Sequence, residues 1–451
     1  MDILGALIGS FALLVISVTH GVFVAYPLLI TLGLLVAVLA RRGFALRNLM
    51  GMAIAGSRKS FSVIGILLII GAVTAVWMAA GTVPAIVYYG IQLINPNLFV
   101  LCAFLLTSFV SFLIGTSFGA ASTIGTALMI MARGSSVDPH LVAGAVIAGA
   151  YWGDRCSPMS SSANLVAAVT KSDLYQNIQN MLATGWLPTA LACVIYAVIS
   201  FFYPVQNTSS SLSAELAKLF DLNLITFLPA IVILVLALLK LPVKQAMLWS
   251  IAAGVVLAFT LQHYTLLQIL QFSFTGFHLE QESSIRSILA GGGIVSMMRV
   301  CAIVIVSTAI SGVLTGTNAL GLVQKFLQSF RSRSGLFVGT TLVSIGASAF
   351  GCTQAIAILL TAELVKPQYE AHYKTPEIAA DRLAIDLENT AVVIAPLIPW
   401  NIAGLVPATV LMSDSGFIPF AVYLYLIPLC YWVVLRSGRE AIGSAEFSQK
   451  S

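Results

Sequence analysis

Charged side chains are scarce in this sequence. Lys and Arg number 22 and Asp and Glu 17 among 451 residues, so 9% are charged, whereas soluble domains have about 25%. With 59% hydrophobic residues, so little charge cannot solvate the surface of a globule of this size, and it excludes a soluble domain. The same hydrophobicity excludes a disordered chain. The net charge of +5 is a small difference between few basic and few acidic residues and does not indicate a basic surface, so we expect no nucleic acid as partner. The partner that we expect is the lipid bilayer.

Sequence signatures of enzymes and of ATP-driven proteins are also missing. The five histidines form no HExxH motif, Gly153-Asp154 lacks the first glycine of a GxGD aspartyl site, and no GxxxxGK[ST] loop is present. We therefore expect neither an intramembrane hydrolase nor direct use of ATP, and we expect no cofactor. The six cysteines include no CxxC pair, and we interpret them as small core residues.

Long apolar runs dominate what is present. Many are long enough to cross the hydrocarbon of a bilayer, which takes roughly 20 residues of helix. Runs such as 66–71 lack the alternation of a transmembrane β-strand, so we predict an all-α polytopic membrane protein. The first run has no basic leader or cleavage site, and we expect a membrane helix there rather than a removed signal. The predicted spans are residues 3–19, 22–40, 61–80, 97–117, 180–203, 223–239, 243–262, 288–314 and 417–435.

Basic residues predict the orientation in the membrane. Five of them, with no acid among them, follow the second predicted span: Arg41, Arg42, Arg47, Arg58 and Lys59. By the positive-inside rule this segment is cytoplasmic, and so is the N-terminus two spans earlier. Arg331 and Arg333 predict a second cytoplasmic loop, and two further arginines follow the last span: Arg436 and Arg439.

The chain repeats itself weakly on either side of a polar midpoint. Ser117-Phe118-Gly119 precedes Asp154, and Ala349-Phe350-Gly351 precedes Asp386, with 36 residues from the phenylalanine to the acid in each half. Many secondary transporters consist of two such repeats with interrupted helices, which are inverted if each repeat has an odd number of spans. The predicted units are an N-terminal half at 1–203, a linker at 204–222, a C-terminal half at 223–436 and a tail at 437–451.

One interrupted apolar segment, 141–170, combines an acid, a proline and hydroxyl groups. Asp154 is followed closely by Pro158, which removes a backbone donor and clashes with the preceding turn, so we expect the helix to break there. Freed backbone groups at membrane depth must be buried in protein or line a wet cavity. The neighbouring oxygen atoms are hard ligands that suit an alkali cation, and they belong to Ser157, Ser160, Ser161, Ser162 and Asn164.

A second interrupted segment, 379–411, contains Asp386 and Glu388. Acids at membrane depth are rare and point to function. Pro396 and Pro399 predict a further break, and half-helix ends from the two segments are then expected to meet at one site. Three polar residues of this segment join the predicted site: Asn389, Thr390 and Asn401.

Structural interpretations of the same residues stay open. Asp386 and Glu388 can pair with Arg382 in an aqueous mouth, and Asp154 can pair with Arg155. Five further polar residues at membrane depth are predicted to line the site, with interhelical hydrogen bonding as the alternative for each: Thr116, Ser117, Ser348, Thr353 and Gln354.

Four sequence blocks together resemble a known family. They occur in order between about residues 61 and 411, as WMAAGTVP at 77–84, GTSFG at 115–119, GDRCSPMS at 153–160 with Asn164-Leu165, and PLIPWN at 396–401. They are similar to the signature blocks of NhaC-type sodium/proton antiporters. The resemblance implies a secondary transporter of the bacterial-type inner membrane, with two inverted repeats, in the wider ion-transporter superfamily. The NhaC-type family that the chain resembles also includes exchangers of organic acids and sodium-coupled amino-acid carriers.

Two departures from the family pattern remove carboxylates. In the family, the block Ser-Pro-Leu-Ser-Asp-Thr-Thr-Asn usually has its aspartate where this chain has Ser161. The block Glu-Asp-Ser-Gly-Thr usually has its aspartate where this chain has Asn389. Two titratable groups are thus missing where a proton would compete with sodium, and this bears on proton coupling more than on sodium binding.

The leading hypothesis is sodium/proton antiport by alternating access at a midplane site. Asp154, Asp386 and Glu388 are the predicted exchange residues, with sodium, the proton or both as coupling ion. The predicted sodium ligands are Ser157, Ser161, Asn164, Glu388 and Asn389. The alternative is sodium-coupled symport or exchange of an amino acid or small organic acid, and a passive channel differs from both in lacking coupling. The oligomeric state stays open, with a homodimer as one candidate.

Overall fold

The computed structural model describes residues 3–135, 137–205, 208–239, 241–279, 283, 286, 288–317, 330, 332–373 and 375–437. The regular structure of these residues consists of helices and one isolated β-bridge between Phe277 and Gly291. In this part of the chain six helices are long and apolar enough to cross a membrane, or eight if two bent pairs each form one span. The prediction of an all-α polytopic membrane protein is confirmed, and the inverted repeats remain a prediction.

The described part of the N-terminal half contains ten α-helices, of which α4, α6, α7 and α9 are short, with at most 12 residues. They are α1 Ile3–Thr19, α2 Ala25–Arg41, α3 Leu46–Ala79, α4 Thr82–Leu93, α5 Phe99–Ile114, α6 Ser117–Ala120, α7 Thr126–Arg133, α8 Pro139–Cys156, α9 Ser161–Thr170 and α10 Leu174–Phe202. A short 3-10 turn, Pro96–Leu98, leads into α5, and a π-helical turn, Ala121–Gly125, joins α6 to α7.

The C-terminal half has a similar mixture of long and broken helices. They are α11 Thr208–Leu219, α12 Leu228–Leu238, α13 Val243–Thr260, α14 Leu266–Thr275, α15 Ile294–Gly316, α17 Arg333–Gly351, α18 Gln354–His372, α19 Pro376–Asn389, α20 Ala391–Ile394, α21 Ile402–Val410 and α22 Val422–Arg436. Three 3-10 turns at Leu224–Phe227, Ala395–Leu397 and Ser415–Phe420 precede α12, follow α20 and precede α22.

One predicted boundary was wrong. Helix α3 begins at Leu46, 15 residues before the predicted span, so Arg47 and Arg58 belong to a 34-residue helix rather than to a loop. Residues such as Leu46, Leu49 and Ala53 extend the apolar pattern toward the N-terminus on one face, which a count of apolar residues alone does not detect. Helix α11 lies within the predicted linker, 204–222, and the division of the chain into two halves around it stays a prediction. Of the other orientation markers, Arg331 and Arg439 lie outside the described residues, as does the tail beyond Ser437.

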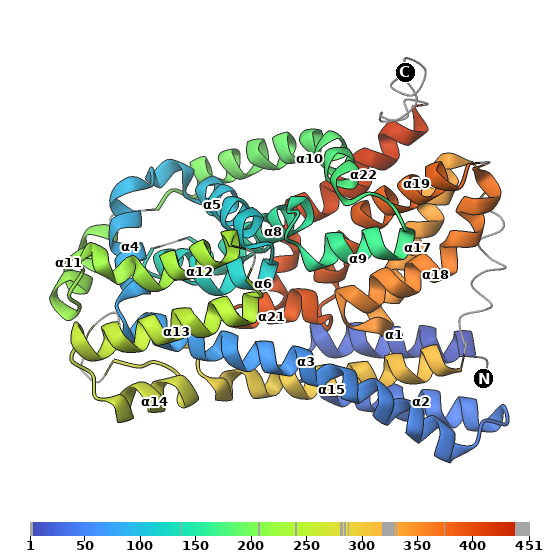
Figure 1. The fold of residues 1–451 in the computed structure, drawn as a ribbon, viewed down its shortest axis with the longest axis horizontal. Helices are drawn as coiled ribbons and strands as arrows, with labels where there is room; N and C mark the ends of the chain where they lie inside the picture. Colours follow the sequence, from blue (N-terminus) through green and yellow to red (C-terminus); the bar gives the residue numbers. More distant parts are fainter. Residues whose placement is uncertain are drawn as a thin grey trace.

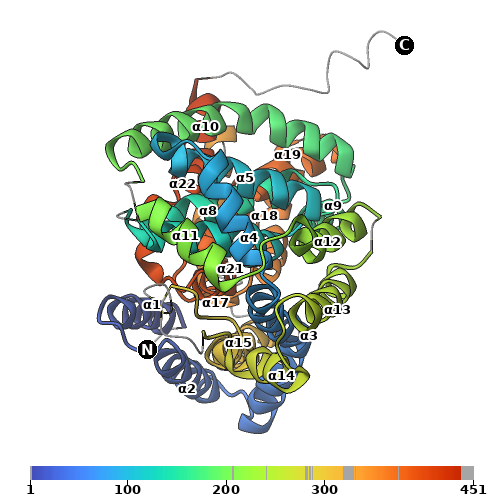
Figure 2. The same cartoon turned by 90° about the vertical axis from the view of Figure 1, so that its left-hand side faces the viewer.

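Long helices lie along two opposite edges of the molecule, and broken helices lie between them. In both views α10 lies along one edge of the molecule, and α1, α2, α3 and α15 lie along the opposite edge (Figure 1 and Figure 2). Helices α3 and α15 pack closely, because Gly56 and Gly312 face each other and a Cβ added to Gly312 would lie 2.8 Å from the Gly56 Cα. Helices α5, α8 and α21 lie in the centre (Figure 2).

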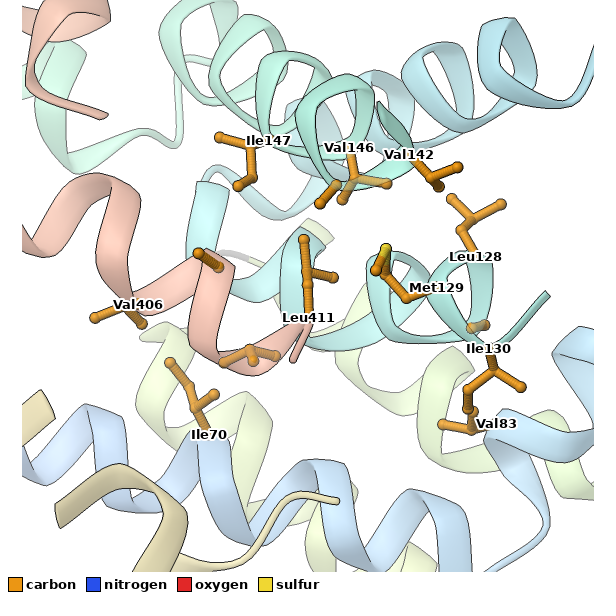
Figure 3. Close-up of a cluster of buried hydrophobic side chains, with 14 of the residues drawn as sticks. Ile70, Val83, Leu128, Met129, Ile130, Val142, Val146, Ile147, Val406 and Leu411 are labelled. Carbon is orange, nitrogen blue, oxygen red and sulfur yellow. The ribbon is translucent and has the colours of Figure 1, made fainter. Parts of the chain in front are cut away.

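A dry core joins the broken helices of the two halves. Side chains from α3, α7, α8 and α21 converge in Figure 3, and Ile70, Val146, Val406 and Leu411 have no solvent exposure. Within a membrane such side chains hold helices together through close van der Waals contact rather than through removal from water. This packing fixes α8 against α21 and thereby places the two interrupted segments side by side.

Each half contains a helix that stops at a residue in the left-handed conformation. Helix α5 ends at Gly115 (φ 72°), and α17 ends at Cys352 (φ 54°). After each break the next residue, Thr116 or Thr353, is extended and begins a new helix. Phe118 lies after the first break whereas Phe350 lies before the second, so the two Phe-Gly pairs do not occupy matching places.

Candidate ion-binding site

The break between α8 and α9 occurs at the predicted proline. Ser157 is extended, and the Ser160 side chain caps α9 by accepting from the Ser162 and Ala163 amides at 3.1 and 3.3 Å. The Asn164 amide donates to the carbonyls of Pro158 (3.1 Å) and Ser160 (2.7 Å). The polar residues of this segment therefore stabilise the loop itself, as the freed backbone groups require.

The second interrupted segment is tied to the end of α17. The Asn401 side-chain amide donates to the Ser348 carbonyl at 2.7 Å, and Trp400 Nε1 donates to the Ala349 carbonyl at 2.7 Å. Both are carbonyls of the last turn of α17, where Ser348 also accepts from the Cys352 amide at 3.2 Å and Ala349 from the Cys352 thiol at 3.3 Å. The chain bends by 52° between Pro376–Leu397 and Ile402–Val410, close to the predicted break.

Two buried carboxyl groups, one on α8 and one on α19, have no ion-pair partner among the described residues. Asp154 is 4% exposed and Glu388 is fully buried, and their charges interact across the two helices. Among the described residues, Asp154 Oδ1 and both Glu388 carboxylate oxygens have no hydrogen-bond partner. Ser117 and Ser160 are polar neighbours of Asp154. Because burying a bare charge is costly, such carboxyl groups bind either a proton or a cation.

A buried arginine lies beside these acids. Arg155 is fully buried, and no carboxylate oxygen of the described residues lies within ion-pair distance of it, so the predicted alternative of an Asp154–Arg155 pair is not observed. All its hydrogen bonds go to uncharged acceptors on α10, α19 and α22. They are the Glu388 carbonyl (3.2 Å), the Met181 carbonyl (3.3 Å), the Tyr423 hydroxyl (3.4 Å), the Thr184 hydroxyl (3.4 Å) and Asn389 Oδ1 (2.5 Å).

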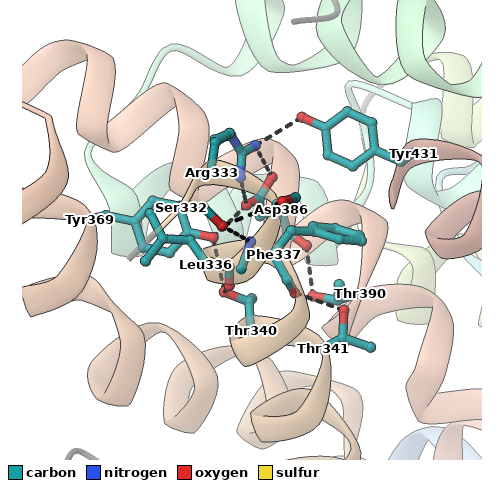
Figure 4. Close-up of polar contacts among 12 residues, drawn as sticks. Ser332, Arg333, Leu336, Phe337, Thr340, Thr341, Tyr369, Asp386, Thr390 and Tyr431 are labelled. Atoms are coloured by element: carbon teal, nitrogen blue, oxygen red, sulfur yellow. Dashed lines mark hydrogen bonds and ion pairs between the residues drawn. The ribbon is translucent and has the colours of Figure 1, made fainter. Parts of the chain in front are cut away.

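Asp386 has a different environment from the other two acids. Arg333, the first residue of α17, donates to both Asp386 oxygens at 2.6 Å, and the Tyr369 hydroxyl donates to the same carboxylate (Figure 4). Arg333 also donates to the Tyr431 hydroxyl at 3.1 Å. The partner is thus Arg333 rather than Arg382, and Asp386 is neutralised within the protein. Of the three predicted exchange residues, Asp154 and Glu388 remain as candidates.

The structure does not bring the five predicted sodium ligands together. Ser161 and Asn164 lie on the exposed face of α9, whereas Ser157, Glu388 and Asn389 are buried. Ser157 Oγ accepts from the Met159 amide at 3.2 Å. The side-chain direction depends on where α9 begins after the break, and the sequence does not fix that register.

The remaining predicted residues have mainly structural contacts. Thr390 donates to the Asp386 carbonyl at 2.6 Å, the Thr353 hydroxyl caps α18, and Gln354 donates to the Val392 carbonyl at 3.1 Å. Thr116 is half-buried, and the buried Ser348 hydroxyl has no partner among the described residues. Of the predicted lining residues, only Ser117 is a polar neighbour of Asp154.

Sequence reasoning missed the roles of Arg155, Arg333 and Tyr369. Arg155 was considered only as a partner of Asp154, although a basic residue inside an apolar segment is itself a signal. The sequence predicts a cytoplasmic loop at Arg333, whereas the structure shows a contact with Asp386 that joins residues 53 apart in the chain.

The fold and the site together define a polytopic membrane protein that carries unpaired acids between broken helices, the class of secondary ion transporters. The profile of the Na+/H+ antiporter family matches residues 2–163 and 149–436. The chain belongs to the Na+/H+ antiporter family. This confirms the predicted family and the prediction of a sodium/proton antiporter-like secondary transporter.

Three curated relatives agree with this assignment. The Na(+)/H(+) antiporter NhaC of Alkalihalophilus pseudofirmus is 30% identical, over 83% of this chain and 81% of its own length. An uncharacterized Na(+)/H(+) antiporter of Haemophilus influenzae is 29% identical, over 87% of this chain and 85% of its own. The malate-2H(+)/Na(+)-lactate antiporter of Bacillus subtilis is 26% identical, over 92% and 89%.

Proposed function

We propose that this protein exchanges sodium for protons at a buried site formed by Asp154 and Glu388. The observation that carries the proposal is that three carboxylate oxygens of these residues, from α8 and α19, have no partner among the described residues. Oxygen ligands of this kind suit sodium, and the same atoms accept protons, so the two ions exclude each other. Broken helices at the site are the usual location of ion binding in secondary transporters.

The proposal includes a location and an orientation. The protein lies in the bacterial inner membrane with its N-terminus in the cytoplasm. Support comes from the basic residues that follow α2, Arg41 and Arg42 among them, because such residues are retained on the cytoplasmic side. A cysteine introduced at Gly43, between α2 and α3, is then labelled by a membrane-impermeant thiol reagent in everted vesicles and not in intact cells. The opposite labelling contradicts the orientation.

Everted membrane vesicles test the exchange itself. Adding sodium to respiring vesicles dequenches a pH-sensitive dye if sodium enters in exchange for protons. We expect dequenching with the natural protein, and its loss with Asp154→Asn and with Glu388→Gln. The matched control is Glu370→Gln, which changes an acid 59% exposed on α18 and leaves dequenching unchanged. Full activity in both site variants contradicts the site.

A second candidate function is sodium-coupled exchange of a small organic solute. A cavity of about 420 Å³ between α3, α15 and α18 supports it, because this volume is large enough for such a solute. Thr308, Ser311 and Thr315 supply hydroxyls there, and Glu363 and Lys366 supply charges of both signs. One relative exchanges malate and lactate by its name. Sodium-dependent uptake of labelled malate or lactate without dye dequenching favours this function over the first.

A further inference from the structure

A permanent positive charge is buried next to the two acids that lack an ion-pair partner. Arg155 follows Asp154 directly in α8, and its Nε donates to the backbone carbonyl of Glu388. A guanidinium stays protonated in proteins, so this charge is present in every step of transport. Its five N–H groups are all used by uncharged acceptors, which hold the group in place without cancelling its charge.

The other titratable groups around Arg155 come from each helix packed against it. They are Cys156 on α8, Glu388 on α19 and Tyr423 on α22. Asp154 precedes Arg155 in the chain, interacts with Glu388 and has Tyr151 beside it. Of these side chains, the carboxylic acids are by nature the most acidic, so they are the groups that exchange protons in the proposed cycle. The buried set therefore contains two negative charges and one positive charge when both acids are ionised.

We propose that Arg155 is the fixed countercharge of the ion site and limits it to one monovalent cation. The inference rests on the proposed sodium/proton exchange. With Arg155 present, the empty site has a net charge of −1, and either one sodium ion or one proton brings it to zero. Because a net charge is costly to bury, the two loaded forms are the ones that cross between the two sides. Exchange is then one for one and electroneutral.

Asn389 offers a way to cancel this charge without removing the arginine. Its Oδ1 accepts from Arg155 Nη2 at 2.5 Å, while its Nδ2 has no partner among the described residues. Asn389→Asp keeps the shape and the hydrogen bond, loses no other contact and forms an ion pair with Arg155. The site then has a net charge of −2 when empty and takes up a second monovalent cation.

The experiment uses the full-length protein in liposomes with a trapped pH dye, a sodium gradient and a membrane potential set by potassium and valinomycin. For the natural protein we expect exchange that does not respond to the potential. For Asn389→Asp we expect exchange that still does not respond to the potential but depends cooperatively on sodium concentration, because two cations are now needed to bring the site to zero net charge. We also expect its half-maximal activity about one pH unit or more further toward alkaline pH, because added negative charge helps the acids keep their protons.

Two arginine variants separate charge from structure. Arg155→Lys keeps the charge and should retain the natural pH profile and electroneutrality, whereas Arg155→Gln should shift the profile as Asn389→Asp does. Electrogenic exchange by the natural protein overturns the inference, and so does an unchanged profile in Asn389→Asp. If the natural protein moves no protons with sodium, the proposed function itself fails, which is a distinct outcome.

Discussion

Breaking the ion pair between Arg333 and Asp386 should lower the stability of the protein strongly, and this effect can be separated from an effect on transport. Arg333 and Asp386 are 11% and 0% exposed, and two 2.6 Å hydrogen bonds join them. Removing one member of a buried pair leaves the other charge uncompensated and costs about 3 to 5 kcal/mol. Removing both charges with residues of similar shape is often close to neutral. Asp386→Asn and Arg333→Gln should therefore each destabilise the protein, and the double variant should recover most of the loss.

Thermal unfolding in detergent and sodium-driven proton movement in vesicles measure the two consequences. We expect each single variant to lower the melting temperature by several degrees and to lose activity only in proportion to the folded protein that remains. The double variant should be active, because Asp386 holds α17, α18 and α19 together and does not bind the ion. Loss of transport in Asp386→Asn at an unchanged melting temperature, without recovery in the double variant, refutes this reasoning.

Three smaller predictions concern backbone and side-chain positions. Lys171 is exposed at the end of α9 with a φ of 62°, so Lys171→Gly should stabilise the protein by about 0.5 to 1 kcal/mol, seen as a higher melting temperature. Gly312→Ala should lower the melting temperature because its Cβ meets the α3 backbone, whereas Gly346→Ala, with nothing within 4 Å, should not. Ser161→Ala should leave the KM for sodium unchanged, because Ser161 lies outside the buried site; a raised KM returns Ser161 to the ligand set.

The class of protein and the helix breaks follow from local features of the sequence. Scarce charge and long apolar runs require a lipid environment, and Pro158 cannot continue α8, which ends at Cys156. The second break, near Pro396 and Pro399, was predicted on the same grounds. These features act within a few residues, so no knowledge of tertiary packing is needed to read them.

The partners of the acids depend on contacts between distant segments. Asp386 and Glu388 are two residues apart in the same helix and therefore face different neighbours, Arg333 on one side and Asp154 with Arg155 on the other. Only the packing of α8, α17 and α19 decides which acid is neutralised. The position of Ser161 depends in the same way on the register in which α9 resumes after its break.

The most direct test is the release of protons when sodium binds to the purified protein. In weakly buffered detergent solution, at a pH where the site holds a proton, a saturating sodium addition should release about one proton per chain, because sodium and the proton compete for the same carboxyl oxygens. Potassium chloride at equal ionic strength serves as the control, and the Asp154→Asn/Glu388→Gln double variant should release none. Equal proton release by the double variant, or none by the natural protein, contradicts the account.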